Sequence, residues 1–197
     1  MKTEPQVRTN LRLVGDLTVL RSKVMEDAEA DYSWRIDPEL ASLDATRPVT
    51  LSLKEYLRYH RDDVRYPSPW SVRMAIDTHD GKHIGNCMYY DIDAEKSQCE
   101  LGIMIGDRNY WSKGYGTDVV KTAVTHIFQP TELERVYLHT LTNNYRAQKS
   151  FRKAGFIPIC EKQRDGYEFV FMEIRRTIWD ADRSKSEIEV PSRTTAK

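Results

Sequence analysis

The sequence has few cysteines, and their spacing excludes several classes of protein. Only Cys87, Cys99 and Cys160 occur, and no two of them form a CxxC pair. An odd, sparse set of this kind supports neither a disulfide framework nor a structural zinc site. We therefore expect reduced thiols in a cytoplasmic protein, and no bound metal. Cys87 and Cys99 fall on neighbouring predicted strands and could lie opposite one another, where packed thiols are favoured over a disulfide.

The chain also lacks an excess of one charge and a long apolar run. Its 197 residues include 30 Lys and Arg and 30 Asp and Glu. This balance gives no argument for nucleic-acid binding or for a disordered acidic chain. No apolar stretch approaches the ~20 residues that span a bilayer, and the first ten residues contain no apolar signal core. We expect neither a nucleic-acid partner nor association with a membrane.

Hydrophobic periodicity predicts a single domain over residues 11–176, with loose residues 1–10 and a polar, mobile tail over residues 177–197. The predicted order is a strand centred on Leu17–Leu20, two helices, three strands, a helix, a strand, a helix and two strands. This order indicates an α/β (α+β) fold with a largely antiparallel central sheet of about seven strands and about four helices.

Local signals support several of these elements. Ser52 and Glu55 have the spacing of a capping box, and the helix that they begin carries a predicted buried stripe of Leu53, Tyr56, Leu57 and His60. Asp80-Gly81 predicts the turn of a hairpin within an antiparallel meander over residues 70–106. A second hairpin is predicted around Asp165-Gly166, between the last two strands.

The segment "RNYWSKGYGTDVVKTAVTHIF", from Arg108 to Phe128, combines a glycine-rich turn with a helix. Gly114 and Gly116 precede the helix, whose first N–H groups carry a partial positive charge and can bind an anion. Ser112, Lys113 and Thr117 add donors. A tight strand-to-helix turn alone would also explain the glycines. A Rossmann fingerprint would need glycine at Val119, and a P-loop would need Lys and Ser or Thr after the last glycine, so neither motif is present.

Together with "NNYRAQKSFRKAGF", this segment resembles the Gcn5-related N-acetyltransferase (GNAT) family. Within that family, the chain is most similar to the branch of ribosomal-protein N-terminal and polyamine acetyltransferases, and "LTVLRS" and "WRIDPE" resemble that branch as well. The resemblance covers roughly residues 11–176. It implies a GNAT-like fold and the activity of an acetyl-CoA-dependent N-acetyltransferase. Trp111 stands where the family pattern has Arg or Gln.

The resemblance also implies which residues bind acetyl-CoA. The backbone N–H groups from Trp111 to Thr117 would hold the pyrophosphate, and the strand before them would bind the pantetheine arm with its main chain. Asn144 matches a family asparagine that touches this arm, although it is equally suited to cap a helix. The implied set is Ile103, Met104, Ile105, Trp111, Ser112, Lys113, Gly114, Tyr115, Gly116, Thr117 and Asn144.

Glu100 is the candidate catalytic base, because the resembled branch often has a working glutamate at this position. A carboxylate among apolar strand residues is costly unless it is paired or useful, so a salt-bridged Glu100 is an equally good interpretation. Phe151 stands where many relatives have a tyrosine that acts as the general acid, and the phenylalanine ring has no proton to donate. Ser150 and Tyr145 are nearby, but neither is a clear substitute.

The acceptor is expected to be a primary amine, on a small molecule or a protein N-terminus, which accepts the acetyl group directly. The resemblance places Trp34, Arg35 and Tyr56 in its binding site. The alternative is an acetyl-CoA-binding sensor or interaction module with little turnover. No histidine is expected to be catalytic: His60 should be packed, His79 and His83 solvated, and His126 and His139 lack partners at metal spacing. The exposed edge of the last strand pair suggests a homodimer.

Overall fold

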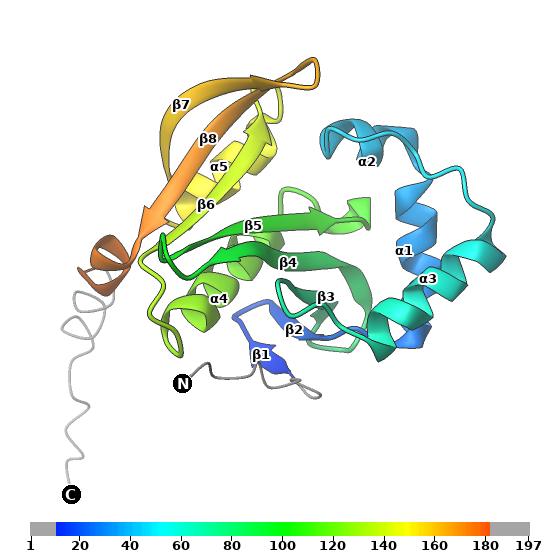
Figure 1. Ribbon diagram of the computed structural model, residues 1–197. Helices are drawn as coiled ribbons and strands as arrows, with labels where there is room; N and C mark the ends of the chain where they lie inside the picture. The colour runs from blue at the N-terminus through cyan, green and yellow to red at the C-terminus, as the bar shows by residue number, and fades with distance from the viewer. Residues whose placement is uncertain (1–10, 182–197) are drawn as a thin grey trace, which may run out of the picture.

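The computed structural model describes residues 11–181, so the predictions for residues 1–10 and 182–197 lie outside the described residues. The described chain forms a mixed α/β domain (Figure 1). Its strands are β1 (Arg12–Val14), β2 (Thr18–Ser22), β3 (Val72–Thr78), β4 (His83–Asp93), β5 (Gln98–Ile105), β6 (Arg135–Leu141), β7 (Ile157–Arg164) and β8 (Tyr167–Arg175). Its helices are η1 (Met25–Asp27), α1 (Ala28–Arg35), α2 (Pro38–Leu43), α3 (Leu53–Arg65), η2 (Arg108–Tyr110), α4 (Tyr115–Phe128) and α5 (Tyr145–Lys153).

The strands form one sheet in the order β1-β2-β3-β4-β5-β6-β8-β7, and only the β5–β6 pair is parallel. The predicted fold class and the largely antiparallel sheet are confirmed. The sheet has eight strands in the described chain, one more than predicted. The predicted first strand is a hairpin, because the N–H of Gly15 bonds to the carbonyl of Thr18 and closes a turn between β1 and β2.

Helices α2 and α3 begin at polar side-chain caps. Asp37 accepts hydrogen bonds from the N–H groups of Glu39 and Leu40, and Pro38 is the first residue of α2. Pro38 therefore begins a second short helix and does not only end the helix before it. The capping box of α3 between Ser52 and Glu55 is present. Leu53, however, is 36% exposed, so its place in a buried stripe was wrong. It is the first residue of α3, where the helix has not yet reached the packed region.

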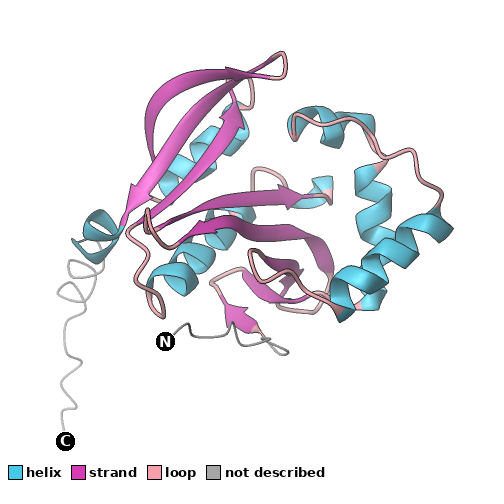
Figure 2. Ribbon diagram, viewed as in Figure 1, coloured by secondary structure: helices cyan, strands magenta, loops and turns pink. Residues whose placement is uncertain are grey.

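The two faces of the sheet are covered differently. Helix α4 lies behind β4 and β5 in Figure 2 and supplies Val119, Val120, Val124 and Phe128 to the main hydrophobic core. Helix α5 packs beside α4 on this covered face. Helices α1 and α3 pack together, and α1 contacts β4. We call the sheet face opposite α4 the open face; because strand side chains alternate, it carries Glu100, Tyr137 and His139.

Strands β5 and β6 separate soon after they pair. Their only register pairs are Gln98 with Arg135, Cys99 with Val136 and Glu100 with Tyr137. Beyond Glu100, β5 continues to Ile105 beside β4, whereas β6 continues beside β8. Figure 1 shows the two strands diverging from this point, which we call the split. The edge of β5 that faces away from β4 is therefore left without a strand partner from Leu101 onward.

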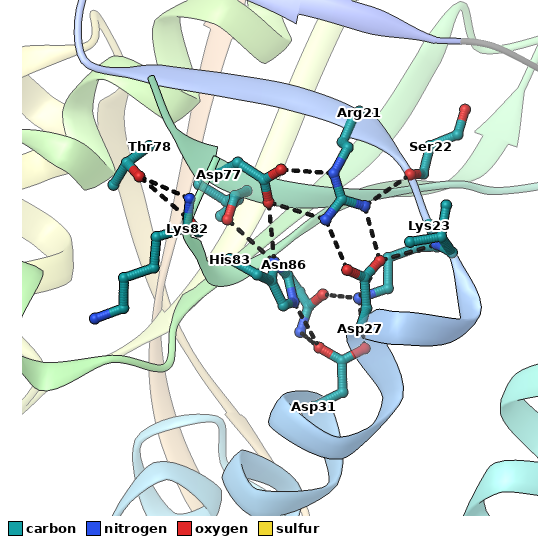
Figure 3. A network of polar contacts seen from close by, with 12 residues as sticks. Arg21, Ser22, Lys23, Asp27, Asp31, Asp77, Thr78, Lys82, His83 and Asn86 are labelled. Carbon is teal, nitrogen blue, oxygen red and sulfur yellow. Dashed lines mark hydrogen bonds and ion pairs between the residues drawn. The ribbon is translucent and has the colours of Figure 1, made fainter. Parts of the chain in front are cut away.

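A buried network of charges joins α1 to the sheet (Figure 3). Asp31 of α1 accepts hydrogen bonds from His83 (3.1 Å) and Asn86 (2.8 Å) of β4 and pairs with Lys23. Burial alone would raise the pKa of Asp31, but the hydrogen bonds and the charge of Lys23 lower it to about 2. His83 was expected to be solvated, and this was wrong because its ring lies in this network, with a side chain only 11% exposed.

The cysteines on the central strands do not face one another. Cys87 pairs with Ile103 across β4 and β5, whereas Cys99 pairs with Val136 of β6. Both are buried free thiols, and burial raises the pKa of each to about 12. A disulfide between them is therefore excluded, and their thiols are unreactive groups of the core.

The described chain ends with a helical turn over residues 176–181. The ring of Trp179 lies 5.5 Å from that of Phe128, so this turn packs on the core although it falls within the predicted tail. Among residues 11–181, no helix has the length and apolar character needed to cross a bilayer.

Candidate active site

A groove lies along the unpaired edge of β5 at Ile103, Met104 and Ile105. Its walls come from β5, the η2–α4 loop, the first half of α5 and helix α2. The lining residues are Leu40, Leu43, Asp44, Ile103, Met104, Ile105, Tyr110, Trp111, Ser112, Gly114, Gly116, Asn144, Arg146, Ala147 and Ser150. The predicted cofactor strand and most of the predicted loop thus lie together. A strand edge with free N–H and C=O groups can bind an extended, amide-containing ligand arm as an added strand.

The start of α4 fits an anion. Gly114 precedes the helix in the left-handed conformation, with φ of 95°, and no side chain caps the helix. Within the described chain, no hydrogen bond involves the main-chain N–H groups from Ser112 to Thr117. These donors are therefore available to a phosphate. The N–H of Trp111 already bonds to the carbonyl of Arg108, so the run of free donors begins one residue later than predicted.

The Trp111 side chain anchors the loop and holds a cation over the groove. Its indole nitrogen donates to the carbonyl of Ile105 (2.6 Å), and the guanidinium of Arg146 lies 3.5 Å from its ring centroid. Arg108 also lies against this ring but is paired with Asp37 and Glu39. Arg146 makes no ion pair in the described part of the chain, and burial lowers its pKa. It is a candidate partner for a ligand phosphate that the sequence analysis missed.

Helix α5 presents a second wall of the groove. Asn144 caps the helix by accepting from the N–H of Ala147 (3.2 Å), and it also lines the groove, so its position is compatible with both interpretations. Ser150 lines the groove, whereas Tyr145 is 76% exposed and is not part of the lining. Phe151 is buried against Phe156 in the core. Of the side chains considered as proton donors, only Ser150 faces the groove.

Glu100 lies at the split and is buried on the open face. Its Oε1 accepts a hydrogen bond from Nδ1 of His139 (2.9 Å). Tyr90 is its cross-strand neighbour on β4, and burial, followed by the charge and hydrogen bond of Glu100, raises the pKa of Tyr90. Tyr90 therefore stays protonated at neutral pH. The Glu100 carboxylate thus has polar neighbours that hold its position. Among the described residues it makes no ion pair with a Lys or an Arg.

The residues predicted to bind the acceptor lie outside this groove. Trp34 lines a separate open hollow with His83 and Gly106, between α1 and η2. Arg35 pairs with Asp44, the residue directly after α2 (3.0 Å), and Tyr56 packs against Tyr32 and His60. Arg35 and Tyr56 thus hold the helices together in the described structure.

The remaining predicted cofactor residues surround the groove without lining it: Lys113 is exposed, Tyr115 packs edge-on against Tyr110, and Thr117 lies in the first turn of α4. The spacing of Asn144, Ala147 and Ser150 on one helix face would have identified the α5 wall. No sequence signal identifies the α2 wall, because α2 reaches the groove only through the tertiary fold. Residues 11–181 contain no cluster of His, Cys, Asp or Glu suited to a metal ion.

A model of the acetyltransferase (GNAT) domain matches residues 18–157. The chain belongs to this family. It is an acetyl-CoA-dependent N-acetyltransferase, and acetyl-CoA is its cosubstrate. The acetyltransferase is 26% identical over 166 residues to the uncharacterized N-acetyltransferase p20 of Bacillus licheniformis, covering 81% of this chain and 93% of that relative. It is 28% identical over 83 residues to a spermine/spermidine N(1)-acetyltransferase of Bacillus subtilis, covering 40% and 55% of the two chains.

Solved structures share the fold of this acetyltransferase. The aminoglycoside acetyltransferase AAC(6')-Ib in complex with coenzyme A has a TM-score of 0.71 at 18% identity, covering 84% of this chain and 99% of that one. The spermidine N-acetyltransferase of Vibrio cholerae in complex with CoA and spermine also has a TM-score of 0.71, at 17% identity, covering 82% and 97%.

Proposed function

We propose that this acetyltransferase moves the acetyl group of acetyl-CoA directly to the primary amine of a small molecule, with Glu100 acting in deprotonation of the amine. The supporting observation is the position of Glu100 at the last β5–β6 pair, where a ligand arm that follows β5 inward would end. The ammonium form of an amine must lose a proton before its nitrogen can attack a thioester, and a buried carboxylate at this point can assist.

The residues of the groove have separate roles in this proposal. The free N–H groups at the start of α4, with Arg146, hold the cofactor phosphates. The unpaired edge of β5 orients the pantetheine arm, which carries the thioester that supplies the acetyl group. The split is closed where β5 and β6 pair at Glu100, so the acceptor would approach from the open face. Orientation of this kind can supply a large share of the rate enhancement.

Polyamines and aminoglycosides are the first acceptors to consider, because named relatives and structural neighbours act on or bind such amines. A protein N-terminus is a second acceptor class. Trp34 is proposed to contact the acceptor from its hollow beside η2, whereas Arg35 and Tyr56 would shape the helical wall on that side. The buried reduced thiols support a cytoplasmic location, and the exposed edge strand β7 supports a homodimer.

The decisive experiment measures CoA thiol release from acetyl-CoA against polyamines, aminoglycosides, amino acids and short peptides. Release with one acceptor class is expected, and Glu100→Gln should lower kcat by ~10²–10⁴-fold, the usual loss when assisted proton transfer is removed. Glu95→Gln, in the exposed β4–β5 turn, is the matched control and should retain wild-type activity.

A binding module without turnover is the second candidate, because Phe151 occupies the core and cannot donate a proton. Cofactor binding by calorimetry with no thiol release from any acceptor would favour this candidate. Activity that survives Glu100→Gln unchanged would instead refute the role of Glu100.

A further inference from the structure

The open face next to the split carries a histidine whose neighbours arrange it for proton transfer. His139 is on β6, two residues beyond the last β5–β6 pair, and therefore borders the split on the side opposite β5. Its Nδ1 lies 2.9 Å from Oε1 of Glu100, and its side chain is 15% exposed. The sequence gives it no signal, because the contact joins residues 39 positions apart.

The hydrogen bond to Glu100 selects one form of the imidazole ring. A carboxylate accepts only, so Nδ1 must carry the proton that is shared with Oε1. In the neutral ring, Nε2 then holds the free lone pair. No described hydrogen bond involves Nε2, and no fully buried side-chain nitrogen or oxygen of the described chain lacks a partner. Nε2 therefore reaches solvent on the open face, whereas the carboxylate behind it is buried.

Rigid packing fixes the direction of the ring. The His139 ring lies 5.1 Å from that of Phe171 and 6.1 Å from that of Phe169, both on β8, and 6.0 Å from that of Tyr137. These aromatic neighbours leave little freedom to rotate away from Glu100. A base that is oriented by a carboxylate and exposes its second nitrogen has the arrangement required for general-base catalysis.

We propose that His139, oriented by Glu100, is the group that exchanges protons with the acceptor amine. This inference rests on the proposed function and assigns Glu100 a positioning role behind His139. In the balanced step, the amine nitrogen bonds to the thioester carbonyl carbon and the carbon–sulfur bond breaks. One amine proton passes to Nε2, and the imidazolium then returns a proton to the departing thiolate or to water. The negative charge of Glu100 stabilises the imidazolium in between.

The charges around the ring are few. Glu100 of β5 and Tyr137 of β6 are its polar neighbours, Tyr90 and Asp91 of β4 lie near these two residues, and Lys162 of β7 lies on the Phe171 ring, 3.9 Å from its centroid. Glu173, further along β8, is paired with Arg135 and Arg175. Glu100 is therefore the one carboxylate among the described residues that bonds directly to this imidazole.

The first test is kinetic. His139→Gln should lower kcat by ~10²–10⁴-fold and leave the KM for acetyl-CoA unchanged, because a general base acts on the reaction rather than on cofactor binding. The acidic limb of the wild-type kcat/KM profile should flatten in this variant. His139→Ala should regain activity when imidazole is added. His79→Gln, in the exposed β3–β4 hairpin, is the matched control. It should have the wild-type kcat, KM for acetyl-CoA and pH profile.

The second test does not depend on turnover. ¹⁵N NMR of histidine-labelled protein without cofactor should show His139 as the Nδ1-protonated tautomer, with its signal assigned by its loss in His139→Gln. Glu100→Ala should convert this signal into a mixture of tautomers. A predominantly Nε2-protonated ring in the wild-type chain would overturn the proposal whatever the activity.

The outcomes separate the two proposals. If the wild-type chain acetylates an amine but folded His139→Gln keeps its rate and its pH profile, only the role of His139 is overturned. If the wild-type chain is inert with every amine class although it binds acetyl-CoA, the proposed function fails and the catalytic role of His139 fails with it.

Discussion

At the scale of single residues, Gly114 and Gly116 serve the groove in different ways. Gly114 has φ of 95°, a conformation that other residues reach only with strain. A Cβ at Gly116 would lie 3.5 Å from the Ser150 hydroxyl, so any side chain there would extend toward the α5 wall. The backbone requirement at Gly114 thus lies at the proposed anion site, so the structural explanation of the glycines is compatible with the functional one.

Gly114→Ala should raise the Kd for acetyl-CoA by about tenfold, because strain at φ of 95° turns the free N–H groups away from the phosphates. Gly81→Ala is the control, since Gly81 has φ of 85° and open space around its Cβ position but lies in the β3–β4 hairpin. Each variant should lose ~1–2 kcal/mol of unfolding free energy. Calorimetric titration measures the binding, and equal affinities in the two variants would contradict the role of Gly114.

Arg146→Gln should weaken acetyl-CoA binding by ~10-fold or more, because a charge-assisted hydrogen bond to a phosphate is worth ~1.5–3 kcal/mol. Wild-type affinity should also fall more steeply with added salt than the affinity of the variant. Lys149→Gln is the control, because Lys149 is exposed on the same helix and does not line the groove. A variant with wild-type affinity and salt dependence would refute a phosphate contact.

At the scale of elements, β5 is a strand with two different edges. One edge pairs with β4 along most of its length, and the other is open beyond Glu100. Half of the main-chain groups of this segment therefore point into the groove rather than into the sheet. The strand is both a structural element and the proposed binding surface for the cofactor arm.

Hydrogen exchange should reveal this asymmetry. Amides of residues 101–105 that point away from β4 should exchange rapidly, and they should slow by about fivefold or more with CoA, as expected for a hydrogen bond of ~1 kcal/mol. Peptides from β3, which is paired on both edges, provide the reference and should not change. Protection of every amide in residues 101–105 without CoA would argue against an open edge.

At the scale of the whole molecule, the charges of Figure 3 fasten α1 to the sheet. Arg21 pairs with both Asp27 (2.7 Å) and Asp77 (2.6 Å), and Asp31 bonds to two residues of β4. The helical wall and the sheet are thereby held in one arrangement. A substitution that removes one of these charged residues would leave its partner's charge buried and unpaired, which lowers the stability of the fold.

The stabilising effect of Asp31 should depend on pH. Its pKa of about 2 in the folded chain lies below the ordinary aspartate value of 3.8, so its charged form favours folding. The shift corresponds to ~2 kcal/mol, which is fully present above pH ~4 and lost as the pH falls through ~2. Urea unfolding should therefore show a difference between the wild-type chain and Asp31→Asn that narrows from pH 5 to pH 2. A constant difference would contradict this contribution.

The sequence by itself determined most of the elements and the glycine turn that precedes α4. Each of the local signals acts within a few residues of the chain, so local backbone preferences are sufficient to predict the elements that they mark. These signals are proline, the Ser52 capping box, the Asp-Gly turns and the Gly114 pattern. The first hairpin escaped prediction, since its turn at Gly15 is held partly by Asp118, about a hundred positions away, which accepts from the N–H groups of Asp16 and Leu17.

Only the tertiary structure decided which side chains meet at the split. The contact between Glu100 and His139, the cover of the groove by α2 and the burial of His83 beside Asp31 all join segments far apart in the chain. Such contacts depend on strand order and on where β5 and β6 part. That geometry results from the packing of the whole sheet on α4 and is not encoded by any local spacing of residues.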